Sequence, residues 1–89
     1  IGELGYILMP DARGNGYARE AVAEAVRYGF EERNYRRIFA DIDPDNAPSI
    51  QLLERLAFQY EGRLRGAWET HIGVRDSVIY ARLSTDRVG

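Results

Sequence analysis

The sequence RGNGYA, residues 13–18, joins a strand-like run to a long amphipathic pattern that is typical of a helix. Backbone N–H groups at the start of a helix have no partner within the helix, and the helix dipole adds partial positive charge there. Gly14 and Gly16 have no Cβ, so a ligand can press against the backbone, and Arg13 adds a cation beside it. The stretch therefore predicts a phosphate-binding loop.

Two well-known glycine motifs do not fit this loop. A dinucleotide-binding fingerprint requires Gly or Ala at the position of Arg19, and an NTP-binding loop requires a lysine, which this sequence lacks. The loop does match the pattern Arg/Gln-x-x-Gly-x-Gly/Ala through Arg13, Gly16 and Ala18. Such a short pattern arises by chance in many loops, so its meaning depends on the surrounding sequence.

Hydrophobic periodicity on both sides of the loop predicts alternating strands and helices. The expected strands cover residues 3–9, 37–42, 58–64 and 77–84, and the expected helices cover about 17–33 and about three turns from an N-cap at Asn46. The looser segment between the last two strands is expected to hold an extended stretch and a hairpin-like return. Strand, helix, strand implies a parallel crossover, so the pattern predicts an α/β (α+β) fold with a mixed sheet.

Three features of the sequence predict local details of the structure. Gly5 within the first strand predicts a bulge or a close backbone approach, since glycine otherwise weakens a strand. Asn34 can take the left-handed conformation that ends the first helix. The apolar stripe from Tyr17 to Phe30 predicts a helix face buried in the core rather than a binding surface.

Composition narrows the classes of function. The 89 residues suffice for one small domain, the formal net charge is −2, and all basic side chains are arginines with no basic face or run, so no nucleic-acid footprint is present. The absence of cysteine excludes disulfides, thiolate metal sites and cysteine nucleophiles. No apolar run is long enough for a membrane span or signal peptide, and a cytoplasmic protein is expected.

The chain opens on Ile1 in strand-like alternation instead of on methionine. We therefore expect residues 1–89 to be a single, partial domain, the C-terminal part of a longer polypeptide. The exposed sheet edge of such a part predicts association into a homo-oligomer, by strand pairing or swapping, unless residues outside this part cover the edge.

Three further motifs accompany the glycine loop: Glu3-Leu4-Gly5-Tyr6, Asn46-Ala47-Pro48-Ser49 and Leu56-Ala57-Phe58. With the loop between them, their order resembles the GNAT acetyltransferases, and within these the RimJ/RimL branch that acetylates the N-termini of ribosomal proteins. The resemblance covers Ile1 to about Leu83 and corresponds to the C-terminal half of the family's fold. Ala57 departs from the pattern, because the family usually has glycine there. The helix exit at Ala57 must therefore either avoid left-handed geometry or carry a cost of about 1 kcal/mol.

The resemblance implies a binding site for acetyl-CoA between two splayed parallel strands. Its pantetheine arm would bond the strand edge, its pyrophosphate would rest on the loop, and no metal is implied. The implied cofactor-binding residues are Ile7, Leu8, Met9, Arg13, Gly14, Asn15, Gly16, Tyr17, Ala18 and Asn46.

The resemblance also implies catalytic roles. Glu3 resembles the general base that acts through water, Ser49 the group that protonates or hydrogen-bonds the CoA sulfur, and backbone N–H groups near Tyr6 to Leu8 the oxyanion donors. The two side chains also have simpler interpretations: Glu3 as a solvated strand residue, and Ser49 as a first-turn residue that bonds the helix N-terminus. Capping alone likewise explains Asn46.

Three other polar or aromatic residues receive weaker assignments. Trp68 could line an acceptor pocket, although core packing is more usual for a lone tryptophan. His71 is interpreted as a surface residue, because nothing near it in sequence suggests catalysis or metal binding. Asp76 resembles a recurrent acidic position of the branch and either touches substrate or caps a turn.

The function that follows is an acetyl-CoA-dependent N-acetyltransferase that acts on a primary amine by direct attack in a ternary complex. The acceptor is a protein N-terminus or a small amine. A different acyl-CoA donor, or a non-catalytic acyl-CoA-binding or assembly module, is the alternative.

Overall fold

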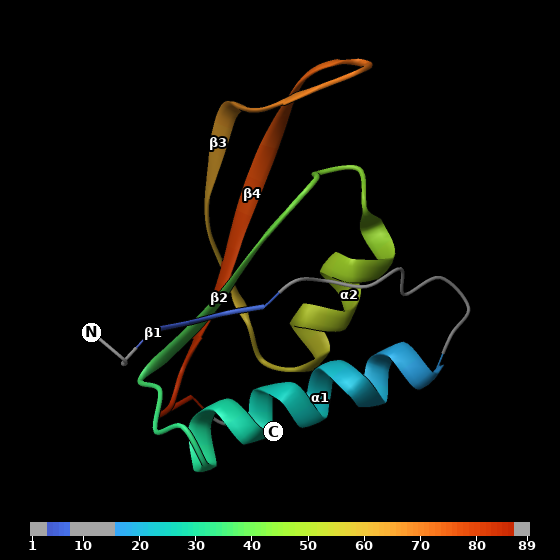
Figure 1. The fold of residues 1–89 in the computed structure, drawn as a ribbon. Coiled ribbons are helices and arrows are strands. Elements are labelled where there is room, and N and C mark those ends of the chain that lie inside the picture. The colour runs from blue at the N-terminus through green and yellow to red at the C-terminus, as the bar shows by residue number, and fades with distance from the viewer. Residues whose placement is uncertain (1–3, 8–15, 87–89) are drawn as a thin grey trace.

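The computed structural model describes residues 4–7 and 16–86, with the backbone alone at 16–18. The elements follow in the order β1 (Leu4–Tyr6), α1 (Gly16–Glu31), β2 (Arg37–Ile42), α2 (Ala47–Arg55), β3 (Gln59–Thr70) and β4 (Gly73–Leu83) (Figure 1). In this part of the chain, four strands form one sheet in the order β1-β2-β4-β3. β1 is parallel to β2, whereas β4 is antiparallel to both of its neighbours. The α/β class and the mixed sheet predicted from the sequence are confirmed.

The core lies between the sheet and the two helices, which pack on the same side of it (Figure 1). Burial alternates along β2, so that every second side chain faces the helices. The cluster is formed by Val22, Val26, Ile38, Ala40, Ile42, Leu52, Leu53, Phe58, Val78 and Tyr80. The predicted apolar stripe of α1 is therefore core through its valines, whereas Ala21 and Ala25, placed on the same stripe by spacing, are exposed.

Tyr35 lies between β1 and α1 and sets their separation. A Cβ atom on Gly5 would be 2.6 Å from the Tyr35 ring, and one on Gly29 would be 3.1 Å from it. The glycine in β1 thus marks a close approach, which is one of the two geometries that the sequence predicts. Asn34, just before Tyr35, has a φ of 56° as expected, although α1 itself ends three residues earlier than this turn.

The second helix begins and ends near its predicted positions. Asn46 is the N-cap, and its side-chain oxygen accepts a hydrogen bond from the Ser49 backbone N–H at 3.4 Å. Proline in the first turn suits this start, because the first N–H groups of a helix have no partner within it. The chain leaves the helix through Ala57, whose φ is 68°, so the left-handed exit is present without the family's glycine.

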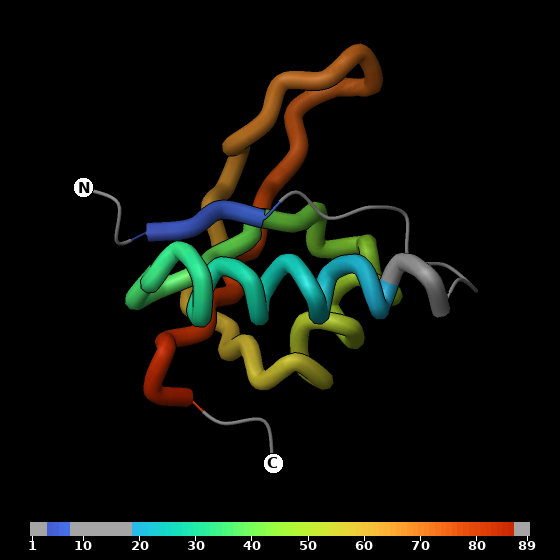
Figure 2. The backbone as a smooth tube through the Cα atoms, turned by 60° about the horizontal axis from the view of Figure 1, so that its bottom comes forward, coloured from blue at the N-terminus to red at the C-terminus, as the bar shows by residue number. Residues whose placement is uncertain are grey.

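The last two strands are longer than expected, and the extended stretch and hairpin-like return expected between them are present. β3 continues to Thr70 and β4 starts at Gly73, so the expected loose segment is the outer part of one long hairpin. The ladder is interrupted by register shifts, one of them between Leu64 and Trp68. Beyond this shift the two strands project as an arm away from the helices (Figure 2).

Candidate functional site

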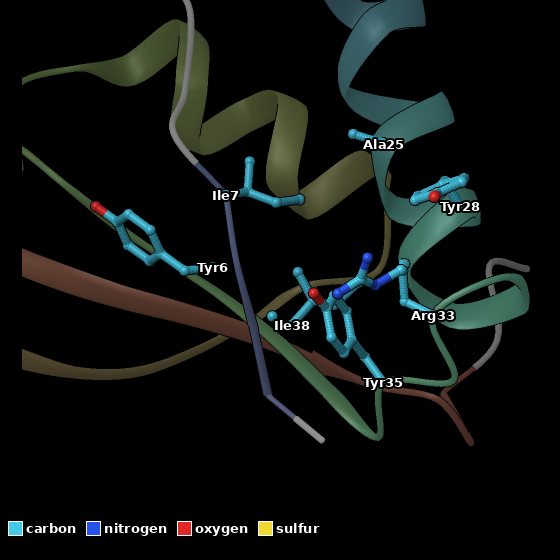
Figure 3. A pocket seen from close by; sticks show the side chains of 9 residues that line it. Tyr6, Ile7, Ala25, Tyr28, Arg33, Tyr35 and Ile38 are labelled. Carbon is cyan, nitrogen blue, oxygen red and sulfur yellow. The ribbon is translucent and has the colours of Figure 1, made fainter. Parts of the chain in front are cut away.

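Successive residues of β1 point to opposite sides of the sheet. Figure 3 shows the Ile7 side chain on the side of α2, whereas the Tyr6 ring points away from the helices. A cavity of about 270 Å³ lies on the helix side of β1, against α1 and Tyr35. The Ile7 N–H donates to the Phe39 carbonyl at 3.0 Å. The expectation that N–H groups near Tyr6 to Leu8 serve as oxyanion donors is therefore wrong for Ile7, because strand pairing already uses its donor.

Ser49 occupies the first turn of α2 and is fully buried. Its hydroxyl has no hydrogen-bond partner, although buried polar groups are almost always paired. The side chain that accepts a hydrogen bond from the start of α2 is Asn46. The simpler interpretation, in which the Ser49 hydroxyl bonds the helix N-terminus, therefore does not hold. The cap role of Asn46 is confirmed, and it leaves the amide nitrogen of that side chain available for a ligand.

The glycine loop itself contributes only its last residues to the described chain. Gly16, Tyr17 and Ala18 are the first residues of α1, so the predicted loop does lead into a helix start. The remaining predicted site residues lie outside the described ranges: Glu3, Leu8, Met9, Arg13, Gly14 and Asn15.

A groove of about 380 Å³ lies near the carboxyl end of β2, bounded on one side by the hairpin arm. Its lining combines two aromatic rings, two carboxylates, one guanidinium, two neutral polar side chains and one isoleucine. These residues are Tyr6, Asp41, Ile42, Asp43, Asn46, Trp68, Thr70 and Arg75. In open sheets of this type, ligands bind at the carboxyl ends of parallel strands, and the groove has that position.

Tyr6 and Asp41 form one wall of the groove. The Tyr6 hydroxyl donates to the Asp41 carboxylate at 3.2 Å, and the Tyr6 ring contacts Phe39 with 5.1 Å between ring centroids. Desolvation and the nearby negative charge raise the pKa of Tyr6 above its ordinary value. The tyrosine therefore keeps its proton at neutral pH and continues to donate to Asp41.

The opposite wall is held by an arginine bonded to two aspartates. Arg75 on β4 donates to both carboxylate oxygens of Asp43, at 2.8 and 2.7 Å, and to Asp45 at 2.7 Å. The Arg75 guanidinium and the Asp45 backbone N–H lower the pKa of Asp43 to about 2. The bidentate pair is therefore charged on both sides at any pH near neutrality.

The weaker sequence assignments have different outcomes. Trp68 is 49% exposed and lines the groove, so core packing was the wrong choice of its two interpretations. His71 is exposed in the hairpin turn. The Asp76 carboxylate accepts from the Gly66 N–H at 2.8 Å and pairs with Arg63, which makes it a residue that holds the ladder shift.

Sequence reasoning missed most of the groove. Tyr6, Asp41 and Arg75 were not singled out as site residues, although the sequence carried a signal for the Asp43 turn, which directly follows a buried strand. Within residues 4–7 and 16–86, no group of three or more His, Cys, Asp and Glu side chains could hold a metal ion. No helix in these same ranges is long and apolar enough to cross a membrane.

Comparison with known proteins connects this geometry to one family. A family model described as an acetyltransferase (GNAT) domain matches residues 2–59. The uncharacterized N-acetyltransferase p20 of Bacillus licheniformis is 39% identical over 98% of this chain and 49% of its own length. The [ribosomal protein uS5]-alanine N-acetyltransferase of Escherichia coli (strain K12) is 35% identical over 78% of this chain and 39% of its own length.

A solved structure gives the same result for the fold. The crystal structure of a GNAT-family acetyltransferase from Bacillus anthracis superposes with a TM-score of 0.81 at 27% identity, over 96% of this chain and 53% of that one. The chain thus spans about half the length, or less, of the relatives it matches.

Proposed function

Because this chain belongs to the GNAT acetyltransferase domain family, we propose that the protein transfers an acetyl group from acetyl-CoA to a primary amine. The amine attacks the thioester directly while both substrates are bound. Residues 1–89 contain no cysteine, so no thiol in this part of the protein could carry the acetyl group as a covalent intermediate.

In this proposal, acetyl-CoA binds on the helix side of the sheet. The pyrophosphate accepts hydrogen bonds from backbone N–H groups of residues 14–18, beside Arg13, where α1 begins at Gly16. The pantetheine arm follows the edge of residues 7–9, and the Asn46 amide contacts it while its oxygen caps α2. The amine acceptor enters from the opposite side, through the groove beside Tyr6.

The reaction requires a neutral amine, stabilisation of the developing oxyanion and a proton for the departing sulfur. Glu3 removes a proton from the acceptor ammonium through water. The amine nitrogen then forms a bond to the carbonyl carbon, and the carbon–sulfur bond breaks. The Ser49 hydroxyl bonds the departing thiolate and passes its proton to the sulfur. The hydroxyl regains a proton from the attacking nitrogen, which loses its second proton as the amide forms.

The observation that carries this assignment is the unpaired hydroxyl of Ser49. A fully buried serine at a helix start loses the hydration of its hydroxyl and gains no hydrogen bond in return. Such a group is explained when a ligand atom supplies the missing partner. A thiolate sulfur at the start of α2 is that partner in the proposed complex.

Ser49→Ala tests the role of the hydroxyl. We expect kcat for acetyl transfer to fall about a hundredfold, because the leaving thiolate loses its proton donor. The calorimetric affinity for acetyl-CoA should stay unchanged and the melting temperature should not fall, since the hydroxyl makes no hydrogen bond in the free protein. The matched control is Ser77→Ala, which removes the unpaired hydroxyl of another fully buried serine, on β4, and should leave kcat unchanged.

Other outcomes would reject parts of the proposal. A complete polypeptide that binds acetyl-CoA but acetylates no member of an amine panel would be a binding module instead of an enzyme. An equal effect of both serine variants on kcat would remove Ser49 from the mechanism. Tighter binding of another acyl-CoA would correct the donor.

The identity of the acceptor is a further part of the proposal. One relative is named for acetylating the alanine of ribosomal protein uS5, which supports a protein N-terminus as acceptor. Peptides with a free N-terminal alanine, compared with the same peptides blocked at the N-terminus, are the first acceptors to assay.

A further inference from the structure

The outer arm of the β3–β4 hairpin has little packing of its own. Ile72 at its tip is 74% exposed, and Val74 is 67% exposed. The arm projects beyond the rest of the fold (Figure 2). Without a contact to another element, its position relative to the groove would depend only on the ladder shift at its base.

Two consecutive residues of β4 fix this arm in different ways. Asp76 accepts from the Gly66 N–H at 2.8 Å and from Arg63, which stabilises the ladder shift at the base of the arm. Arg75 reaches out of the hairpin altogether and binds Asp43 and Asp45 in the turn between β2 and α2. The arginine is therefore a tether between the arm and the rest of the sheet.

The tether acts next to Trp68. Trp68 is the ladder partner of Arg75, and both side chains line the groove together with Tyr6. The chain has one tryptophan, and about half of its surface is exposed at this position. Without the bonds from Arg75 to Asp43 and Asp45, the outer part of the β3–β4 hairpin could move. The distance between Trp68 and Tyr6 across the groove would then no longer be fixed.

The charges of the groove favour a cation. Its lining has two carboxylates, Asp41 and Asp43, against the single guanidinium of Arg75. That guanidinium is already engaged by two aspartates, and the Tyr6 hydroxyl neutralises no charge on Asp41. The exposed rings of Tyr6 and Trp68 add two surfaces that attract an ammonium group.

We propose that Arg75 is a positioning residue for the acceptor: by tying the hairpin arm to Asp43 and Asp45, it holds Trp68 as the wall of a groove that receives a protonated amine. This inference rests on the proposed acetyl transfer and adds the side chains that select its acceptor. Asp41 and the two aromatic rings recognise the ammonium group, and the tether fixes the width of the groove.

The test is Arg75→Gln, assayed in the complete natural polypeptide. We expect the KM for the amine acceptor to rise about three- to tenfold, with kcat and the KM for acetyl-CoA nearly unchanged, because the variant alters the position of the groove wall and not the reacting groups. Arg75→Lys keeps the charge but not the bidentate geometry and should show an intermediate KM. Trp68→Ala, which removes the wall itself, should raise the acceptor KM at least as much.

A second readout does not require turnover. Acrylamide quenching of Trp68 fluorescence, identified by its loss in Trp68→Phe, should increase in Arg75→Gln because the freed arm exposes the indole. The matched control is Arg27→Gln, which also breaks ion pairs to two carboxylates, Glu24 and Glu31, but on the exposed face of α1. This control should change neither the quenching nor the acceptor KM.

The outcomes separate this inference from the function on which it rests. A wild-type protein that transfers no acetyl group overturns the proposed function, and the acceptor role of Arg75 with it. An active wild type in which Arg75→Gln changes neither the quenching nor the acceptor KM overturns the positioning role alone. Increased quenching with an unchanged acceptor KM shows a tether that does not shape the acceptor site, which also overturns the proposal.

Discussion

Ala57 carries backbone strain at the exit of α2. Its φ of 68° places a residue with a Cβ in the left-handed region, where that atom crowds the following carbonyl. The turn is nevertheless held, because the Phe58 N–H donates to the Leu53 carbonyl at 2.9 Å and Arg82 donates to the Leu56 carbonyl at 3.3 Å. Surrounding contacts therefore keep a conformation that alanine alone disfavours.

We predict that Ala57→Gly raises the free energy of unfolding by about 0.5–1 kcal/mol, since glycine adopts positive φ without strain but has a more flexible unfolded chain. Chemical denaturation measures the change. The control is Ala25→Gly, at an exposed position inside α1, which should lower the free energy of unfolding by about 1 kcal/mol. A loss of stability in Ala57→Gly would show that the turn is not strained.

Single residues also show how far the site could be read from the sequence. Asn46 was predicted as an N-cap because a cap residue followed by proline is a local signal, whereas Ser49 was singled out by the resemblance to the family. The structure places both at the start of α2. Arg75 could not be found in this way. Its partners Asp43 and Asp45 are brought to it only by the pairing of β2 with β4, which no local pattern encodes.

At the scale of elements, the contact between β1 and α1 depends on small residues around Tyr35. We predict that Gly5→Ala lowers the free energy of unfolding by about 1–3 kcal/mol, because the new Cβ would lie 2.6 Å from the Tyr35 ring and 3.2 Å from the Ile38 side chain. Thermal or denaturant unfolding measures this loss.

The control for this prediction is another strand glycine. Gly62→Ala on β3 adds a Cβ with no neighbour within 4 Å and should leave stability nearly unchanged. Gly5→Ala combined with Tyr35→Ala should be less destabilised than the sum of the two single changes, since the clash disappears with the ring. If the two changes in the free energy of unfolding were simply additive, the destabilisation by Gly5→Ala would not come from a clash with the Tyr35 ring.

Elements with one buried face were predicted well, and those without one were not. β2 matches the expected range because its burial alternates regularly. All but one of the β3 residues are exposed, so the strand has no regular hydrophobic pattern. Its inner part was predicted as a strand, but its outer part was expected only as a looser segment with an extended stretch and a hairpin-like return. Hydrogen bonds across the hairpin, together with Asp76 at the ladder shift, order this segment instead.

At the scale of the whole molecule, the groove depends on the order of the strands. Tyr6, Asp43 and Trp68 come from three distant parts of the sequence and meet because β4 lies between β2 and β3. The sequence predicted a parallel pair and a hairpin, but it contained no signal for where the hairpin would join the sheet. The acceptor side of the site could not be predicted for that reason.

The sheet has an open side at β1. Within the described residues, β1 is the outer strand next to β2, and its residues Leu4 and Tyr6 are 59% and 46% exposed. An unpaired edge with apolar side chains can pair with a second copy of the chain. We therefore predict that residues 1–89 associate in solution, and that Leu4→Lys weakens this association whereas Ile72→Lys on the hairpin tip does not.

Pairing along the open edge would make the stability of the fold depend on protein concentration. If two copies pair along β1, mass action stabilises the paired form as the protein becomes more concentrated. The melting temperature should then rise with protein concentration in the unmodified chain and much less in Leu4→Lys, and light scattering should show the corresponding change in mass. A melting temperature that does not depend on concentration would mean that each chain folds independently and that its edge remains unpaired.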